Sequence, residues 1–181
     1  MKITPSHING LLVIKPQVFR DSRGYFLESF SKKRYAEAGI SDFVQDNQSL
    51  SQKGVLRGLH FQKPPFAQGK LVRVITGSVL DVAVDIRKNS PTYGQYHAEL
   101  LDEQNQIQFW IPPGFAHGFL TLEDNTLFAY KCTEYYNKES EDAIRWNDPD
   151  IHINWDFESP LLSEKDQEAP FLKDFDSPFS I

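Results

Sequence analysis

Cysteine, positive charge and long apolar runs are all scarce in this sequence. Cys132 is its single cysteine, which excludes an intramolecular disulfide and favours a reducing compartment. The formal net charge of −6 argues against a general nucleic-acid binder, which needs a basic face to neutralise phosphates. No apolar run approaches the roughly 20 residues of a membrane span, and residues 1–10 lack the apolar core of a signal peptide. We therefore expect a cytoplasmic protein that binds neither nucleic acid nor membrane.

Short strands separated by Gly and Pro dominate what is present. Candidate strands cover residues 11–14, 17–19, 25–30, 71–75, 79–86, 97–101, 106–111, 116–122 and 126–133. Strands that recur at about ten-residue spacing predict an all-β fold, a jelly-roll sandwich or barrel. Short peripheral helices are expected over residues 32–38 and around 160–168. The length of 181 residues, 40% of them hydrophobic, suits one domain over 1–181, with the tail after residue 144 folded over the barrel.

Residues 54–86 combine two strand-like alternating segments with charged or titratable side chains. Apolar side chains alternate over 71–75 and again over 79–86, which predicts two half-buried strands, and Gly77-Ser78 between them predicts a hairpin. Arg57, His60 and Lys70 lie on this unit. Two cations beside one titratable histidine indicate a site for an anionic ligand, although a lone histidine between Leu59 and Phe61 is more often a hydrogen-bonded core residue.

His117 lies in the segment WIPPGFAHGF, residues 110–119. The spacing from Pro112 through Gly114 to His117 resembles the second motif of the cupin superfamily, in which this histidine is often a metal ligand. The first motif should supply two histidines and a glutamate, but the chain offers His60 followed by Gln62, Gln68 and Lys70. A metal needs several matched ligands, and a lysine repels a dication, so we expect no metal. His117 then either hydrogen-bonds at a strand edge or contacts a substrate phosphate or sugar.

Four further candidate residues each have an explanation that requires no function. Tyr130 lies mid-strand, where tyrosines are usually core aromatics whose hydroxyl reaches water. Asp166 follows Ser163 in a pattern that resembles a capping box, and acids stabilise a helix N-terminus in any case. Arg23 and Glu28 on one predicted strand could form a surface ion pair. Each residue alone is weak, and their combination needs an explanation.

That explanation comes from a resemblance that runs along nearly the whole chain. The segments that carry it are DSRGYFLESF, FVQDNQSLS, GVLRGLHFQKPPFAQGKLVRV, DVAVDIRKNSPTYG, WIPPGFAHGF, YKCTEYYNKESE and IRWNDPDIHINW. Together, and in this order, they closely resemble the dTDP-4-dehydrorhamnose 3,5-epimerase family. The resemblance implies a metal-free cupin-type jelly roll, no cofactor, and dTDP-4-dehydro-6-deoxy-D-glucose as substrate. It also implies a homodimer in which N-terminal residues of one subunit help to complete the other subunit's site.

The resemblance also implies roles for individual residues. His60 is similar to the family's catalytic base, Asp166 to the carboxylate that orients it, Tyr130 to the proton donor on the opposite face of the sugar, and Lys70 to the lysine near the C4 oxygen. The positions implied to contact the nucleotide sugar are Arg23, Phe26, Glu28, Gln45, Asp46, Asn47, Arg57, His117, Tyr136, Glu141 and Lys165.

These residue types suit the chemistry of an epimerase. A C4 ketone acidifies the C3 and C5 protons, and inversion needs a base on one face and an acid on the other. Three alternatives stay open at this point. A non-catalytic nucleotide-sugar binder would keep the arginines, a metal-dependent cupin oxygenase would need a transition metal, and a single-site epimerase or ketoisomerase would use the same enolate.

Overall fold

Strands make up almost all the regular structure of the computed structural model, which describes residues 1–40 and 42–181. In chain order the elements are β1 (Lys2–Pro5), β2 (Leu12–Lys15), β3 (Val18–Asp21), β4 (Gly24–Leu27), α1 (Lys32–Ala36), β5 (Gln45–Ser51), β6 (Leu56–Gln62), β7 (Lys70–Thr76), β8 (Ser78–Asp85), β9 (Tyr96–Asp102), β10 (Gln108–Ile111), β11 (Phe115–Thr121), β12 (Thr126–Cys132), β13 (Glu141–Ala143), α2 (Glu164–Glu168) and the 3₁₀ helix η1 (Leu172–Asp174).

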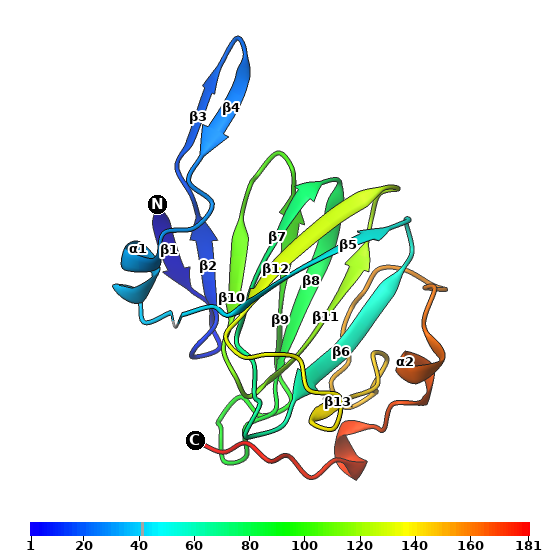
Figure 1. Ribbon diagram of the computed structural model, residues 1–181. Coiled ribbons are helices and arrows are strands. Elements are labelled where there is room, and N and C mark those ends of the chain that lie inside the picture. Colours follow the sequence, from blue (N-terminus) through cyan, green and yellow to red (C-terminus); the bar gives the residue numbers. More distant parts are fainter. Residues whose placement is uncertain (41) are drawn as a thin grey trace.

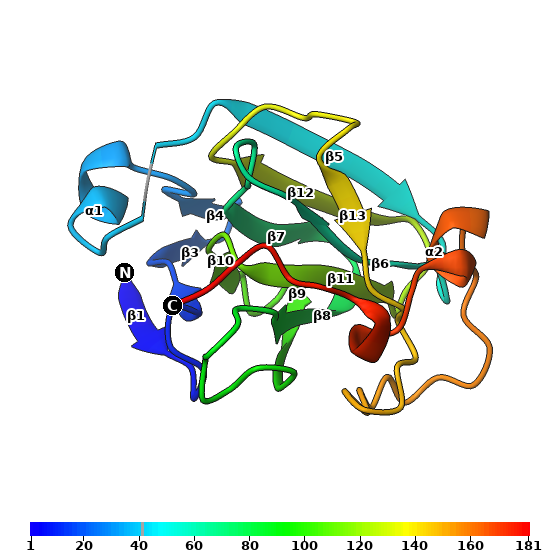
Figure 2. The same cartoon turned by 90° about the horizontal axis from the view of Figure 1, so that it is seen from below.

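Two sheets face each other across the core (Figure 1). The larger has the order β1-β2-β10-β7-β12-β5 and the smaller the order β13-β6-β11-β8-β9. The pairs within both sheets are antiparallel, for example β7 with β12 and β8 with β11. Figure 2 shows the two short helices at opposite ends of this sandwich. The prediction of an all-β jelly roll with short peripheral helices is confirmed.

The predicted hairpin at Gly77-Ser78 is wrong. Strand β7 pairs with β10 and β12, whereas β8 pairs with β9 and β11 in the opposite sheet. The turn at Gly77, whose φ is +82°, therefore carries the chain from one sheet to the other. Alternation specifies which side chains face the core, but it does not specify the neighbouring strand, so a corner between sheets resembles a hairpin in sequence.

The core has a layer between the sheets and a second layer outside the smaller sheet. Val74 and Phe128 of the larger sheet meet Val79 and Ala83 of the smaller one, all of them buried. On the outer side, residues of the tail such as Trp155 pack against the smaller sheet. Strand β8 is therefore buried on both faces, where its alternation predicted a half-buried strand, because the tail covers the face that would otherwise contact water.

A two-stranded hairpin, β3–β4, extends away from the sandwich (Figure 1). Its second strand, β4, ends at Leu27, whereas the predicted strand continued to residue 30. Its aromatic residues Phe19, Tyr25 and Phe26 are exposed. Helix α1 follows it and ends at Ala36, two residues before the predicted end.

No helix among residues 1–40 and 42–181 is both long and apolar enough to cross a membrane.

A buried carboxylate fixes the turn that follows β8. The Asp85 side chain is buried and accepts hydrogen bonds from the Arg87 guanidinium at 2.7 and 2.9 Å, from Ser90 Oγ at 2.6 Å and from Thr92 Oγ1 at 2.7 Å. Burial alone would raise the pKa of Asp85, but these hydrogen bonds outweigh it and lower the pKa from 3.8 to about 2. The folded state therefore favours the ionised carboxylate.

We expect Asp85→Asn to lower the free energy of unfolding at pH 7 by about 2 kcal/mol, the equivalent of the pKa shift. Because the folded pKa is depressed, this contribution is present above pH 4 and is lost as the pH falls toward 2. Urea unfolding of both proteins at several pH values between 7 and 2 measures it. A difference that stays constant over this range would contradict the assigned role of the charge.

Candidate active site

A cavity of about 440 Å³ lies between the two sheets, and residues at the start of α2 form part of its wall. Its wall includes six side chains that can transfer a proton or bind an anion: Arg57, His60, Lys70, His117, Tyr130 and Asp166. A smaller recess of about 100 Å³ shares His60, Lys70 and Tyr130 with it. Residues that are far apart in sequence thus meet in one place.

An irregularity in β6 brings Arg57 and His60 to the same cavity. Residues three apart on a regular strand face opposite sides, but the pairing of β6 with β11 shifts register between His117 and Phe119. Gly58 lies at this shift with φ of +141°, a conformation that is almost restricted to glycine. A Cβ added to Gly58 would lie 2.5 Å from the Cα of Gly118. The bulge therefore depends on glycine at position 58.

His60 and Asp166 form a hydrogen-bonded pair at one wall of the cavity. His60 Nε2 lies 2.5 Å from Asp166 Oδ1, and the carboxylate is 3% exposed while the imidazole is 29% exposed. Because an ionised carboxylate can only accept, Nε2 carries the proton and Nδ1 keeps a free lone pair. The pair therefore fixes the tautomer of the neutral imidazole in which Nδ1 can accept a proton.

The start of α2 positions Asp166. Ser163 is the N-cap, and its Oγ accepts a hydrogen bond from the Asp166 backbone N–H at 3.2 Å, as in the capping interpretation of the sequence. Burial would raise the pKa of Asp166, but hydrogen bonds with His60, Ser163 and the Gly58 backbone outweigh it and lower the pKa. Asp166 makes both interactions at once. Its backbone N–H donates to the capping Ser163 Oγ, and its carboxylate contacts His60.

Tyr130 and Lys70 belong to the larger sheet, which faces His60. They project from the neighbouring strands β12 and β7 and line both parts of the cavity. Burial raises the pKa of Tyr130, with Cys132 adding to the effect and Arg57 opposing it. Tyr130 therefore keeps its proton at neutral pH. Burial lowers the pKa of Lys70, while Cys132, Asp81 and Glu141 favour its charged form.

A second histidine–carboxylate pair lies beneath the cavity. His117 Nε2 lies 2.9 and 3.0 Å from the two carboxylate oxygens of Asp81, and both side chains are buried. Burial lowers the pKa of His117 although Asp81 opposes this. Asp81 is absent from the predicted site residues, although its sequence position carries a signal: it shares a strand face with Val79 and Ala83. An acid among inward-facing apolar residues requires a partner.

The predicted substrate contacts nearest the His60–Asp166 pair fall into two groups. Arg57 reaches Ser51 Oγ at 3.3 Å at the rim of the larger cavity. The others surround the small recess: Gln45, Asn47, Tyr136 and Glu141. There the Tyr136 hydroxyl donates to Glu141 Oε2 at 3.0 Å, and Lys165 Nζ contacts the same oxygen at 2.6 Å. This network can offer hydroxyl, amide and ammonium groups to a sugar or phosphate.

Four predicted contacts are not brought to the cavity of this chain. Arg23 and Phe26 lie on the β3–β4 hairpin, where Arg23 is 88% exposed and pairs with Asp21. Glu28 follows the hairpin and pairs with Arg34 at 3.1 Å. Asp46 lies on the outer face of the larger sheet and pairs with Lys131, because it alternates with the inward-facing Gln45 and Asn47.

The side chains of the cavity do not fit a divalent metal. Among residues 1–40 and 42–181, no three His, Cys, Asp or Glu side chains gather closely enough to form a set of metal ligands. Lys70 also lines the cavity beside His60 and His117, and an ammonium group repels a dication.

Proton donors and acceptors on facing sheets of a jelly roll place the chain in the class of cupin-type isomerases. Comparison with known proteins gives the family within that class: residues 5–174 match the family model described as dTDP-4-dehydrorhamnose 3,5-epimerase. The chain belongs to this family.

Individual relatives agree with this assignment. The dTDP-4-dehydrorhamnose 3,5-epimerase of Shigella flexneri is 49% identical over 178 residues, which cover 97% of this chain and 98% of that protein. The crystal structure of dTDP-6-deoxy-D-glucose-3,5-epimerase from Legionella pneumophila Philadelphia 1, in complex with dTDP-4-keto-L-rhamnose, is 52% identical with a TM-score of 0.93 and covers 97% of this chain and 94% of that one. A 3′-monoepimerase from Streptomyces bikiniensis, in complex with dTDP-quinovose, is 32% identical with a TM-score of 0.89 and covers 93% and 87%.

We expect Gly58→Ala to lower the free energy of unfolding by about 2 kcal/mol or more, because it combines backbone strain with a clash against Gly118. Gly24→Ala is the matched control, since Gly24 has a similar φ of +130° but nothing within 4 Å of an added Cβ. Denaturant unfolding of both variants separates packing from backbone strain. Equal losses would show that the contact between β6 and β11 is not the constraint.

Proposed function

We propose that this chain inverts C3 and C5 of dTDP-4-dehydro-6-deoxy-D-glucose and so forms dTDP-4-dehydro-L-rhamnose. One observation carries the proposal: His60 and Tyr130 line a single cavity from opposite sheets. A sugar ring held between them would present one face to an imidazole and the other to a phenol. Inversion at carbon requires this arrangement, since a single base on one face would only restore the starting configuration.

The first step is removal of a carbon-bound proton. The C4 ketone acidifies the hydrogens on C3 and C5, and Nδ1 of His60 takes one of them, because Nε2 is engaged by Asp166 at 2.5 Å. The carbon–hydrogen electron pair moves into the ring to form an enolate with its charge on the C4 oxygen. Asp166 stabilises the imidazolium that results.

Lys70 stabilises the charge that develops on the C4 oxygen. Its ammonium group lies in the recess that His60 and Tyr130 share. This stabilisation increases as the proton leaves, so it favours the transition state over the bound ketone. A partly buried cation is effective here because little water competes for the oxygen.

Tyr130 returns a proton to the opposite face. Burial raises the pKa of its hydroxyl, so the phenol is protonated at neutral pH, as an acid must be at the start of the step. After each inversion His60 holds one extra proton and Tyr130 holds one fewer. Exchange with solvent at the cavity restores both groups before the next inversion.

We also propose a homodimer in which each hairpin β3–β4 supplies Arg23 and Phe26 to the partner's cavity. In support, this hairpin extends from its own sandwich, and Phe26 is 68% exposed. Arg23 would add a phosphate contact to that of Arg57, since guanidinium groups suit diphosphate oxygens.

We place the reaction in the cytoplasm, in keeping with one buried, unpaired cysteine.

The test of the reaction is incubation of the keto-sugar with the protein in deuterated water, followed by NMR of the product. For the wild type we expect deuterium at both C3 and C5 and a product with the L-rhamno configuration. For His60→Ala we expect turnover to fall by a factor of roughly a hundred to ten thousand while the fold stays intact. His152→Ala is the control, since His152 is exposed and lies outside the cavity. A wild-type protein that binds the sugar without deuterium incorporation would be a binding protein.

For Tyr130→Phe we expect exchange of the C3 and C5 protons with solvent to continue while product formation falls by a factor of about a hundred or more. The variant keeps the base and the oxygen contact but lacks the opposing acid. Parallel measurement of deuterium in the recovered substrate and of product gives the ratio. If both fall together, Tyr130 is not simply the reprotonating acid.

A single-site epimerase is the second candidate, because the Streptomyces bikiniensis relative is named a 3′-monoepimerase at 32% identity. The same enolate chemistry would serve it, with one centre held away from His60 or Tyr130. Deuterium and inversion at only one carbon would favour this alternative. The higher identity to 3,5-epimerases, 49% for the Shigella flexneri protein, favours the double inversion.

A further inference from the structure

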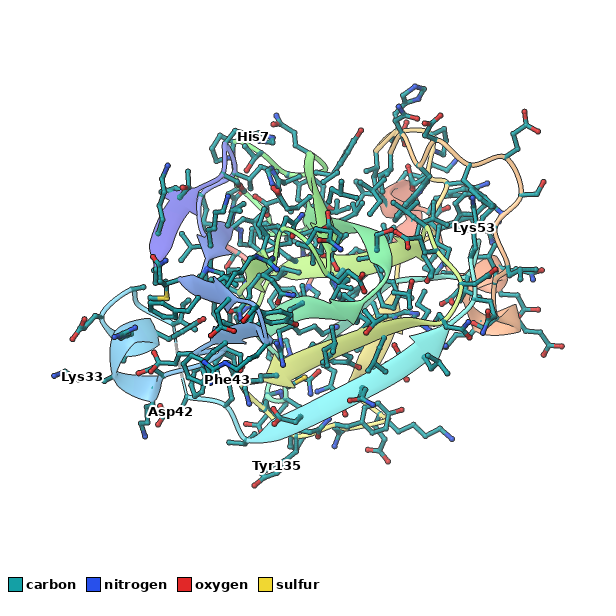
Figure 3. The ribbon with its side chains drawn as sticks, turned by 90° about the horizontal axis from the view of Figure 1, so that it is seen from above. His7, Lys33, Asp42, Phe43, Lys53 and Tyr135 are labelled. Carbon is teal, nitrogen blue, oxygen red and sulfur yellow. The ribbon has the colours of Figure 1, made fainter. Side chains whose placement is uncertain are left out.

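A second histidine cluster lies outside the cavity, at an open edge of the sandwich. His7 is exposed in the turn between β1 and β2, and Figure 3 shows it at the periphery of the molecule. His97 lies near the start of β9, the edge strand of the smaller sheet. The two Nδ1 atoms are 3.5 Å apart, whereas the ring centroids are 5.5 Å apart. The two nitrogens therefore face each other across a short gap.

A neighbouring carboxylate defines which nitrogen of His97 is available. His97 Nε2 lies 3.2 Å from Glu99 Oε2, and the two side chains are 17% and 22% exposed. An ionised carboxylate accepts the Nε2–H and leaves the Nδ1 lone pair directed toward His7. Metal-binding histidines in proteins commonly have this arrangement, in which a carboxylate holds the ring nitrogen that does not bind the metal.

The spacing of the two nitrogens suits a shared metal better than a hydrogen bond. Nitrogen-donor hydrogen bonds usually span about 2.7–3.2 Å, shorter than the 3.5 Å observed. Two imidazoles on one tetrahedral Zn²⁺, each about 2.0–2.1 Å from the metal, have nitrogens about 3.3–3.4 Å apart. His97 is also held in place by Phe109, with ring centroids 5.3 Å apart, so one ligand is preorganised.

We propose that His7 and His97 bind a first-row transition-metal dication such as Zn²⁺ or Ni²⁺, with Glu99 orienting His97. Imidazole is a preferred ligand for these metals, whereas Mg²⁺ prefers oxygen. Two side chains bind the metal and water completes its coordination, which agrees with the lack of any three-ligand group among the described residues. None of the three residues lines the cavity of His60.

Bound metal would connect the two sheets. His7 belongs to the β1–β2 turn at the edge of the larger sheet, and His97 belongs to the edge strand of the smaller sheet. The metal would join these edges where the described pairings place no strand contact between β2 and β9. It acts on the folded state, because the two histidines are 90 positions apart in sequence and are brought together by folding.

Calorimetric titration of the untagged protein with Zn²⁺ and Ni²⁺ tests the site, since a polyhistidine tag would itself bind these ions. We expect one site per chain that His7→Ala or His97→Ala abolishes and that Glu99→Gln weakens by a factor of about 10–100. His152→Ala is the matched control and should bind as the wild type does. Mg²⁺ should give no binding.

Two further readouts separate ligand loss from misfolding. His7 is exposed, so His7→Ala should keep the wild-type melting temperature without metal and lose the rise that saturating Zn²⁺ gives the wild type. Epimerisation by His7→Ala should equal that of the wild type. Equal affinity of the wild type and His7→Ala for Zn²⁺, or loss of binding in His152→Ala, would overturn the proposal.

Discussion

The close approach of β6 and β11 at Gly58 and Gly118 is the constraint on which the rest of the site depends. A side chain at position 58 would meet the backbone of Gly118 at 2.5 Å, so the strands can pair with their shifted register only when both lack a Cβ. The shift turns Arg57 and His60 toward one cavity. It also directs the Gly58 backbone toward Asp166, whose pKa that contact helps to lower. One backbone feature thus positions both Arg57 and the proposed base.

The jelly roll supplies the two faces that inversion chemistry needs. Each sheet contributes its own functional group to the same cavity, His60 from the smaller sheet and Tyr130 from the larger. A single sheet could not do this, because its inward side chains all approach a ligand from one side. The pKa of Tyr130 is raised and that of Lys70 is lowered mainly by the same burial. The enclosure of the cavity therefore also shifts the pKa values of the acid and the cation that line it.

The sequence predicted those features that depend on local alternation and on motif identity. The positions of β2 to β4 and β7 to β12, the inward direction of Tyr130 and the joint placement of His60 and Lys70 follow from short-range pattern. Strands β1, β5, β6 and β13 were not among the expected strands. The crossing at Gly77 did not, since the side-chain period is the same whether two strands pair or face each other. Asp81 was missed because its partner His117 is 36 positions away in sequence. Asp46 was grouped with its neighbours by motif, although alternation puts it on the other face.

The link between His60 and Asp166 also has a consequence for the order in which the protein becomes functional. His60 lies in the first half of the chain, while Asp166 belongs to a segment near the C-terminus that packs against the smaller sheet. A nascent chain still attached to the ribosome could therefore complete its sheets and yet lack a correctly oriented imidazole. Proteolytic clipping behind β13 would have the same effect on a finished molecule. Orientation of the imidazole in this fold thus depends on the presence of the tail.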